Sequence, residues 1–134
     1  MYLKANNKGW LTMPKDNRLV VAGCRDIHDY SVASSEITKH LQTLDADYSV
    51  IIVSGCAEGA DKLGERYASE HNLTVERFPA EWDKYGKYAG PRRNAQMAQV
   101  ADAVLVFWDG KSKGTKNMIE NAKKANKPYT VISI

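Results

Sequence analysis

Cysteine is scarce in this sequence, which leaves little room for disulfide bonds. Cys24 and Cys56 are its only cysteines. A chain of 134 residues with 43% hydrophobic composition can bury a core without such cross-links, so one domain is expected. We expect free thiols, although the two residues follow strands that are neighbours in the fold expected below, which leaves a disulfide as the alternative.

Long hydrophobic segments are also missing. No apolar run approaches the ~20 residues that cross a bilayer. The first residues lack the apolar core of a signal peptide. We therefore expect a soluble, cytoplasmic protein with no membrane partner.

An excess of charge is absent as well. The 19 Lys and Arg residues against 16 Asp and Glu residues leave a net charge of +3. This balance disfavours a protein whose affinity rests mainly on DNA phosphates. It does not exclude local clusters of basic residues. His28, His40 and His71 lack the spacing of metal ligands, so no metal site is expected. No cofactor is expected either.

Apolar runs alternate with helical patterns along most of the chain. A continuous run such as 50–53 is typical of a parallel strand covered on both faces. The weaker, alternating run 74–78 is ended by Pro79 and is expected at an edge of the sheet. The pattern predicts an α/β fold, a doubly wound three-layer sandwich with a mainly parallel five-stranded sheet. The expected strands are 19–22, 50–53, 74–78, 103–108 and 129–134, and the expected helices are 31–44, 57–70, 92–100 and 115–125.

Two segments depart from this alternation. Residues 1–17 read as an N-terminal arm ahead of a domain at 18–134, and the arm carries an apolar patch of Trp10, Leu11 and Met13. Leaving that patch in water is unfavourable, so we expect it to be buried against the domain or a second copy. Residues 79–91 read as a long polar and aromatic loop, and a loop of that length in a small domain usually has a function.

The loops that follow the expected strands predict a ligand site. In a doubly wound sheet these loops all open at the carboxyl edge. The loop 54–60 is rich in small residues and leads into a helix, whose unpaired N–H groups make it the first candidate for an anion cradle. The expected ligand-binding residues are Gly23, Cys24, Arg25, Ser54, Gly55, Cys56, Gly59, Asp61, Trp82, Arg93, Asn94, Asp109, Gly110, Gly114 and Thr115.

Five stretches together resemble one known family. They are 23–26 (Gly-Cys-Arg-Asp), 54–61 (Ser-Gly-Cys-Ala-Glu-Gly-Ala-Asp), 79–86, 89–97 and 107–118. Their order and multiplicity resemble the YspA-like, YpsA-related branch of the SLOG superfamily, from about Arg18 to the end. That superfamily is Rossmann-like and includes cytokinin-activating phosphoribohydrolases, the DNA-uptake protein DprA, and sensor domains associated with nucleotide or NAD-derived ligands. The resemblance therefore implies a Rossmann-like fold with a nucleotide-type pocket.

The resemblance departs from the phosphoribohydrolase members at one position. Those members carry Pro-Gly-Gly-x-Gly-Thr-x-x-Glu with a catalytic glutamate, whereas the matching stretch here keeps Gly114 and Thr115 but has Met118 in place of the glutamate. Phosphate binding at the Gly-Thr turn is thus implied more strongly than hydrolysis. If the protein is a hydrolase, the catalytic acid or base is expected among Asp61, Glu81 and Asp109.

Two of the expected site residues have structural alternatives. Arg25 can bind a phosphate as a planar, always charged fork, or it can pair with Asp26 or Asp29 on the surface. Asp61 can contact a ligand or cap its own helix. The sequence leaves both choices open.

Three further residues, two arginines and a tryptophan, also have alternative roles. Arg92 and Arg93 open an expected helix, where cations oppose the helix dipole, and an anion between them would explain that placement. Trp82 can stack on a base, or it can pack against the fold or a second subunit.

The sequence thus favours a sensor-like protein that binds a nucleotide or a nucleotide-derived ligand, such as an NAD or ADP-ribose relative. Hydrolysis of a nucleotide N-glycosidic or phosphate bond is one alternative, and nucleic-acid binding of the DprA kind is another, less favoured one. A homodimer or higher homo-oligomer is expected, with the arm or the aromatic segment near Trp82 in the contact.

Overall fold

The computed structural model describes residues 4–5, 11–12 and 15–134. Its main body is a five-stranded sheet in the order β5-β4-β3-β6-β7, in which all neighbours run parallel. The expected doubly wound fold is confirmed, and β5 is an edge strand as predicted. The strands are β3 (Lys15–Gly23), β4 (Tyr48–Ser54), β5 (Thr74–Arg77), β6 (Ala103–Trp108) and β7 (Tyr129–Ser133).

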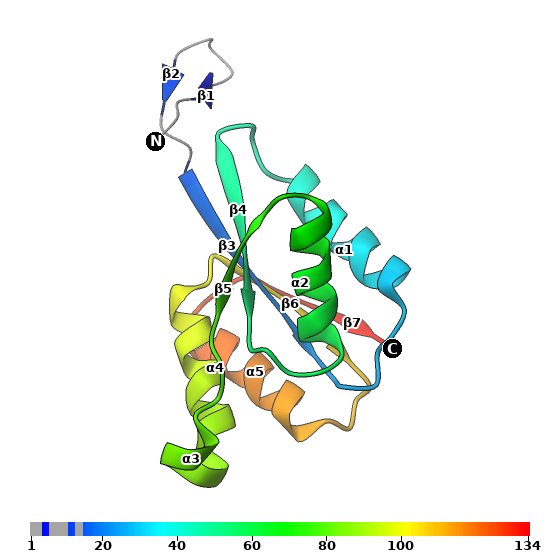
Figure 1. Cartoon of the computed structure of the whole chain (residues 1–134), viewed down its shortest axis with the longest axis vertical. Coiled ribbons are helices and arrows are strands. Elements are labelled where there is room, and N and C mark those ends of the chain that lie inside the picture. The colour runs from blue at the N-terminus through cyan, green and yellow to red at the C-terminus, as the bar shows by residue number, and fades with distance from the viewer. Residues whose placement is uncertain (1–3, 6–10, 13–14) are drawn as a thin grey trace.

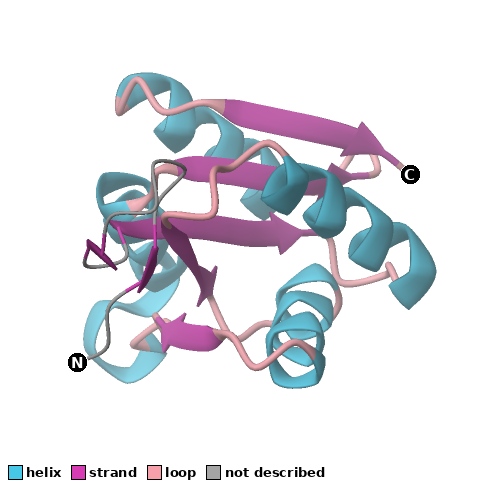
Figure 2. Ribbon diagram, turned by 90° about the horizontal axis from the view of Figure 1, so that it is seen from above, coloured by secondary structure: helices cyan, strands magenta, loops and turns pink. Residues whose placement is uncertain are grey.

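Helices cover both faces of the sheet and make three layers (Figure 1 and Figure 2). One face packs against α1 and α2 around Ile37 and Tyr67, and the other packs against α4 and α5 around Met97 and Met118. No helix in the described ranges is long and apolar enough to span a membrane. The helices are α1 (Tyr30–Gln42), α2 (Ala60–Glu70), α3 (Trp82–Tyr85), α4 (Ala89–Val100) and α5 (Lys113–Lys124), with a 3₁₀ turn, η1 (Gly86–Tyr88).

The central strand β3 shows why its apolar run is continuous. Leu19 and Val21 join the core beneath α1 and α2, whereas Val20 joins the core beneath α4 and α5. Successive side chains of a strand point to opposite faces, so a strand covered on both sides is apolar throughout. The strand starts at Lys15, earlier than the apolar run, because its polar first residues still pair with β4, beginning with Lys15 opposite Tyr48.

The described parts of the N-terminal segment form a small antiparallel pair. It joins β1 (Lys4–Ala5) to β2 (Leu11–Thr12). Trp10 and Met13, which belong to the apolar patch expected in an interface, lie outside the described residues. The division of the chain into an arm and a domain stays a prediction.

The segment 79–91 is not the loop that its composition predicts. It forms α3 and η1 and includes the first residues of α4. The N–H groups of Lys84 and Tyr85 donate to the Glu81 carbonyl and close the first short turn. Pro91 is the third residue of α4, where a missing N–H sacrifices no hydrogen bond, so the helix starts at Ala89 rather than at 92.

Candidate functional site

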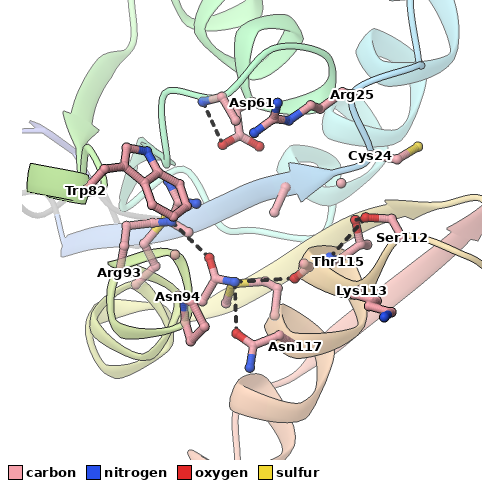
Figure 3. A pocket seen from close by; sticks show the side chains of 18 residues that line it. Cys24, Arg25, Asp61, Trp82, Arg93, Asn94, Ser112, Lys113, Thr115 and Asn117 are labelled. Atoms are coloured by element: carbon pink, nitrogen blue, oxygen red, sulfur yellow. Dashed lines mark hydrogen bonds between the residues drawn. The ribbon is translucent and has the colours of Figure 1, made fainter. Parts of the chain in front are cut away.

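A pocket of about 340 Å³ opens at the carboxyl edge of the sheet. It lies beyond the ends of β3 and β6, where the strand order reverses (Figure 3). Its walls come from the loops after β3 and β4, from α4, and from the start of α5. The expected site residues in its lining are Gly23, Cys24, Arg25, Asp61, Trp82, Arg93, Asn94, Gly114 and Thr115.

Several expected site residues support the pocket without lining it. Ser54 is fully buried, and its hydroxyl donates to Glu65 Oε2 at 2.6 Å and accepts the Cys56 N–H at 3.1 Å. Its polar atom is therefore used inside the fold rather than offered to a ligand. The residues outside the lining are Ser54, Gly55, Cys56, Gly59, Asp109 and Gly110. Cys24 and Cys56 are free thiols, as expected.

Two of these glycines are required by close packing. A Cβ on Gly59 would lie 2.4 Å from the Cys24 carbonyl oxygen, and the φ of Gly59 is +85°. A Cβ on Gly55 would lie 2.7 Å from both Arg93 Nη1 and Asp61 Oδ2. The small residues of this loop thus bring the ends of β3 and β4 together and leave room for two pocket side chains.

The N-terminus of α2 is less open to an anion than the sequence predicts. The N–H of Ala60, the first helical residue, donates to the Cys24 carbonyl at 3.3 Å. The buried Asp61 carboxylate lies beside it and accepts the Ala57 N–H at 3.2 Å. An incoming phosphate would meet this carboxylate, so the loop 54–60 acts as a support for the pocket.

The N-terminus of α5 also borders the pocket, and its surroundings differ from those of the α2 N-terminus. Ser112 is the N-cap, and its hydroxyl oxygen accepts the Thr115 N–H at 3.3 Å and the Thr115 hydroxyl at 2.9 Å. The N–H groups of Lys113 and Gly114 have no acceptor among the described residues. A Cβ on Gly114 would meet nothing within 4 Å. Unpaired N–H groups at a helix start, next to a lysine and open space, favour an anion.

Arg93 is held in place by its neighbours. Its Nη1 donates to the Gly55 carbonyl, and its Nε donates to Asn94 Oδ1 at 3.0 Å. Asn94 in turn donates to the Gly114 carbonyl at 3.3 Å and to Asn117 Oδ1 at 3.0 Å. The guanidinium has five N–H donors, so it keeps donors for a ligand while its position is fixed.

The helix dipole does not explain the position of the two arginines. Because α4 starts at Ala89, Arg92 and Arg93 lie a full turn inside the helix, where the dipole is weak. Arg92 stacks on the Tyr85 ring at 4.4 Å and faces a small separate hollow that also contains Glu81. Arg93 therefore reaches the pocket because of its contacts with Gly55 and Asn94, not because an anion compensates the dipole.

Arg25 is an exposed cation of the pocket wall. It has no hydrogen bond or ion pair within the part of the chain that the structure describes, so the alternative pair with Asp26 or Asp29 is not formed. Asp29 instead caps α1 by accepting the N–H groups of Ser31 and Val32. The guanidinium of Arg25 is thus available to a ligand.

Asp61 is the one carboxylate in the pocket lining that the structure describes, and it is 4% exposed. Burial raises the pKa of Asp61 from 3.8 to about 6. The hydrogen bond from Ala57 and the charge of Arg93 lower that pKa and offset only part of the burial effect, and Glu65 raises it slightly. The lining therefore contains three cationic side chains and one weakly acidic carboxylate, and the cations are Arg25, Arg93 and Lys113.

The other two acidic candidates have different surroundings. Asp109 Oδ1 accepts the N–H groups of Lys111 and Ser112, both at 2.8 Å, and these bonds lower the pKa of Asp109. This carboxylate shapes the turn that leads into α5. Glu81 lies in the separate hollow beside Arg92. Neither residue lines the main pocket, and Asp61 is the acid that remains there.

The predicted binding residues leave out three polar residues of the lining. Ser112 and Lys113 precede the Gly114–Thr115 turn, and Asn117 lies one helical turn after Lys113. A serine three residues before a threonine at a helix start is an N-cap signal, and the sequence contains it at Ser112. Asn117 carried no signal, because its role depends on Asn94 from another helix. Within the described residues, no three His, Cys, Asp or Glu side chains gather as a metal site.

Sequence comparison finds a family model that matches about half of the chain and a relative that covers most of it. The model of the YspA, cpYpsA-related SLOG family matches residues 17–85. The Gene 61 protein of Mycobacterium phage D29 is 32% identical over 117 residues, which is 83% of this chain and 92% of the phage protein.

Structure comparison agrees with the fold. The X-ray structure of DNA processing protein A (DprA) from Streptococcus pneumoniae superposes with a TM-score of 0.66 over 91% of this chain, at 20% identity. The chain spans about half of that DprA chain, with 51% covered, and at this identity the likeness supports the fold alone. By its family match and its close relative, the chain belongs to the YspA, cpYpsA-related SLOG family.

Proposed function

We propose that the pocket binds a nucleotide or a nucleotide-derived ligand, with a phosphate at the N-terminus of α5. The observation that carries this proposal is the pair of unpaired N–H groups of Lys113 and Gly114, which line the pocket together with Arg25 and Arg93. Family membership and the Rossmann-like fold are consistent with nucleotide-related binding. Backbone donors, a helix start and guanidinium groups are the usual partners of a phosphate.

The base is assigned to the side of the pocket near Trp82. This indole is 54% exposed and lines the pocket, and one edge of its ring lies against Gly90, where a Cβ would be 3.2 Å from it. An exposed indole at a pocket mouth can stack on a base. Asp61 lies buried in the same lining and can accept a hydrogen bond from a ribose hydroxyl.

Calorimetric titration with AMP, ADP-ribose and adenosine tests the phosphate assignment. One charge-assisted contact contributes ~1.5–3 kcal/mol, so adenosine should bind at least about tenfold more weakly than the phosphorylated ligands. Inorganic phosphate should compete with them. Equal affinity for AMP and adenosine would contradict the assignment.

Arg25→Ala is the matched variant for this assay, with Arg92→Ala as its control. Arg25 lines the pocket without a protein partner, whereas Arg92 stacks on Tyr85 outside the main pocket. The first variant should weaken AMP binding by about tenfold or more, and the control should bind as the native protein does. Equal effects of both variants would place the phosphate elsewhere.

Hydrolysis of the bound nucleotide is a second candidate, and the pKa of Asp61 favours it. A buried carboxyl with a pKa of about 6 can donate or accept a proton near neutral pH. Met118 lines the pocket where the phosphoribohydrolase motif has its glutamate, so Asp61 is the acid available to a ligand.

Mass spectrometry after incubation with AMP and ADP-ribose separates the two candidates. Release of free base or phosphate by the native protein, lost in Asp61→Asn, would support hydrolysis. Retention of intact ligand by both proteins would support binding without turnover.

A further inference from the structure

The edge strand β7 presents an uncovered apolar surface. It borders β6 on one side, and none of the described elements lies on its other side (Figure 2). Tyr129, Val131 and Ile134 are 40%, 37% and 48% exposed, which makes this strand and the residue after it the main cluster of exposed large hydrophobic side chains among the described residues. An unpaired edge with apolar side chains is a template for another strand.

The backbone of β7 points a regular set of groups outward. The Val104 N–H donates to the Pro128 carbonyl, and the Ile134 N–H donates to the Trp108 carbonyl. In the parallel ladder between these two bonds, the even-numbered residues of β7 therefore pair with β6. The N–H and C=O groups of Tyr129, Val131 and Ser133 then face away from the sheet.

The opposite edge of the sheet is protected. β5 is a short strand of four residues that ends in Glu76 and Arg77, and Pro79 follows soon after. Glu76 accepts a hydrogen bond from Arg18 Nε at 2.6 Å, and Arg77 pairs with Glu65 at 3.1 Å. Charges and a nearby proline are common means of blocking an edge. No charged residue occurs in 129–134.

We propose that β7 pairs antiparallel with β7 of a second copy of this chain, so that one sheet runs through both. Two-fold symmetry puts Val131 opposite Val131 of the second copy, and Tyr129 opposite Ser133 of the second copy. Each of the three outward-facing residues then donates and accepts one hydrogen bond. The strand is complementary to itself in hydrogen bonding, and no like charges meet, which favours a second copy over an unrelated peptide.

The side chains around the strand allow this approach. Ile132 packs toward α1 and α2, so Tyr129 and Val131 point to the α5 face, where Lys123 Nζ lies 5.9 Å from the Tyr129 ring centre. On the other face, Thr130 borders an open groove of about 500 Å³ next to α1. Val131, which faces its own copy, is β-branched and Tyr129 is aromatic, and both residue types are favourable in a sheet.

Light scattering during size exclusion, at protein concentrations from about 1 to 100 µM, measures this assembly. The native chain should have the mass of a dimer. Val131→Lys puts two ammonium groups opposite each other at the symmetry axis and should raise the dimer dissociation constant at least about tenfold. Thr74→Lys, an exposed position on β5, is the matched control and should leave the dimer intact.

A mixing experiment distinguishes the loss of strand pairing from misfolding of the variants. Val131→Lys and Val131→Glu should each be monomeric alone, and mixing them should restore a dimer, because the two substituted residues face each other only in this arrangement. A native monomer at 100 µM would overturn the proposal. So would a dimer that survives Val131→Lys, or charge variants that fail to pair when mixed.

Discussion

The helix starts of α2 and α5 both border the same pocket, yet they offer it different surfaces. The start of α2 follows a loop of small residues, but its first N–H is bound to the Cys24 carbonyl and the buried Asp61 carboxylate lies beside it. The start of α5 has one glycine, Gly114, and two N–H groups without an acceptor among the described residues. Glycine content alone therefore does not identify an anion site. Each helix start keeps two N–H groups without an acceptor among the described residues, so what differs is the buried Asp61 carboxylate beside the start of α2.

Glycine substitution at the two sites should separate them most strongly. Gly59→Ala puts a Cβ 2.4 Å from the Cys24 carbonyl oxygen in a left-handed backbone conformation, so it should lower the free energy of unfolding by about 3 kcal/mol or more. Gly114→Ala has open space and should change stability by less than about 1 kcal/mol while weakening AMP binding. Urea denaturation measures both. Similar losses in the two variants would contradict the comparison.

The pH dependence of stability should reveal the buried carboxylate near α2. The folded-state pKa of Asp61 is raised from 3.8 to about 6, so the folded protein holds this proton more tightly than the unfolded chain. Relative to Asp61→Asn, the native protein should lose about 3 kcal/mol of stability as the pH rises from about 4 to above 6. The asparagine keeps an oxygen for the Ala57 N–H. If the unfolding free energies of the native protein and Asp61→Asn change in parallel between about pH 4 and 7.5, Asp61 does not titrate this way.

Arg93 connects the two sides of the pocket, and its loss should affect binding more than folding. Arg93→Ala removes a charge-assisted contact and should weaken AMP binding by ~1.5–3 kcal/mol, or about tenfold to a hundredfold. Arg93→Lys keeps the charge but cannot reach Gly55 and Asn94 with the same fork. Its affinity for AMP should therefore lie between those of the native protein and Arg93→Ala. Calorimetry of the three proteins decides this. An unchanged affinity in Arg93→Ala would remove Arg93 from the site.

The N-cap of α5 should give the smallest effect. Ser112→Ala removes the acceptor for the Thr115 N–H and should cost about 1 kcal/mol of stability. Ser112→Asp restores a cap but brings a negative charge to the pocket, so it should retain stability and weaken binding of AMP. If the aspartate variant binds AMP as well as the native protein, the phosphate does not lie at this helix start.

Much of the fold and part of the site could be read from local patterns. The strand 103–108 was predicted to the residue, because a run covered on both faces is apolar throughout. Gly23, Arg25 and Gly114 were predicted to share one edge, since a doubly wound sheet collects the loops after its strands. The segment 79–91 failed as a loop prediction because short turns and a proline within the first turn of α4 leave weak sequence signals.

By itself, the sequence determined the order of the elements, the edge position of β5 and the family, because periodicity and motif order depend on neighbours along the chain. Tertiary structure alone decided which groups surround each helix start. Ala60 is capped by Cys24 and Arg93 is held by Gly55, and in each pair the partner comes from a different loop or helix. Hydrogen bonds between residues far apart in the chain depend on packing distances that no local pattern encodes.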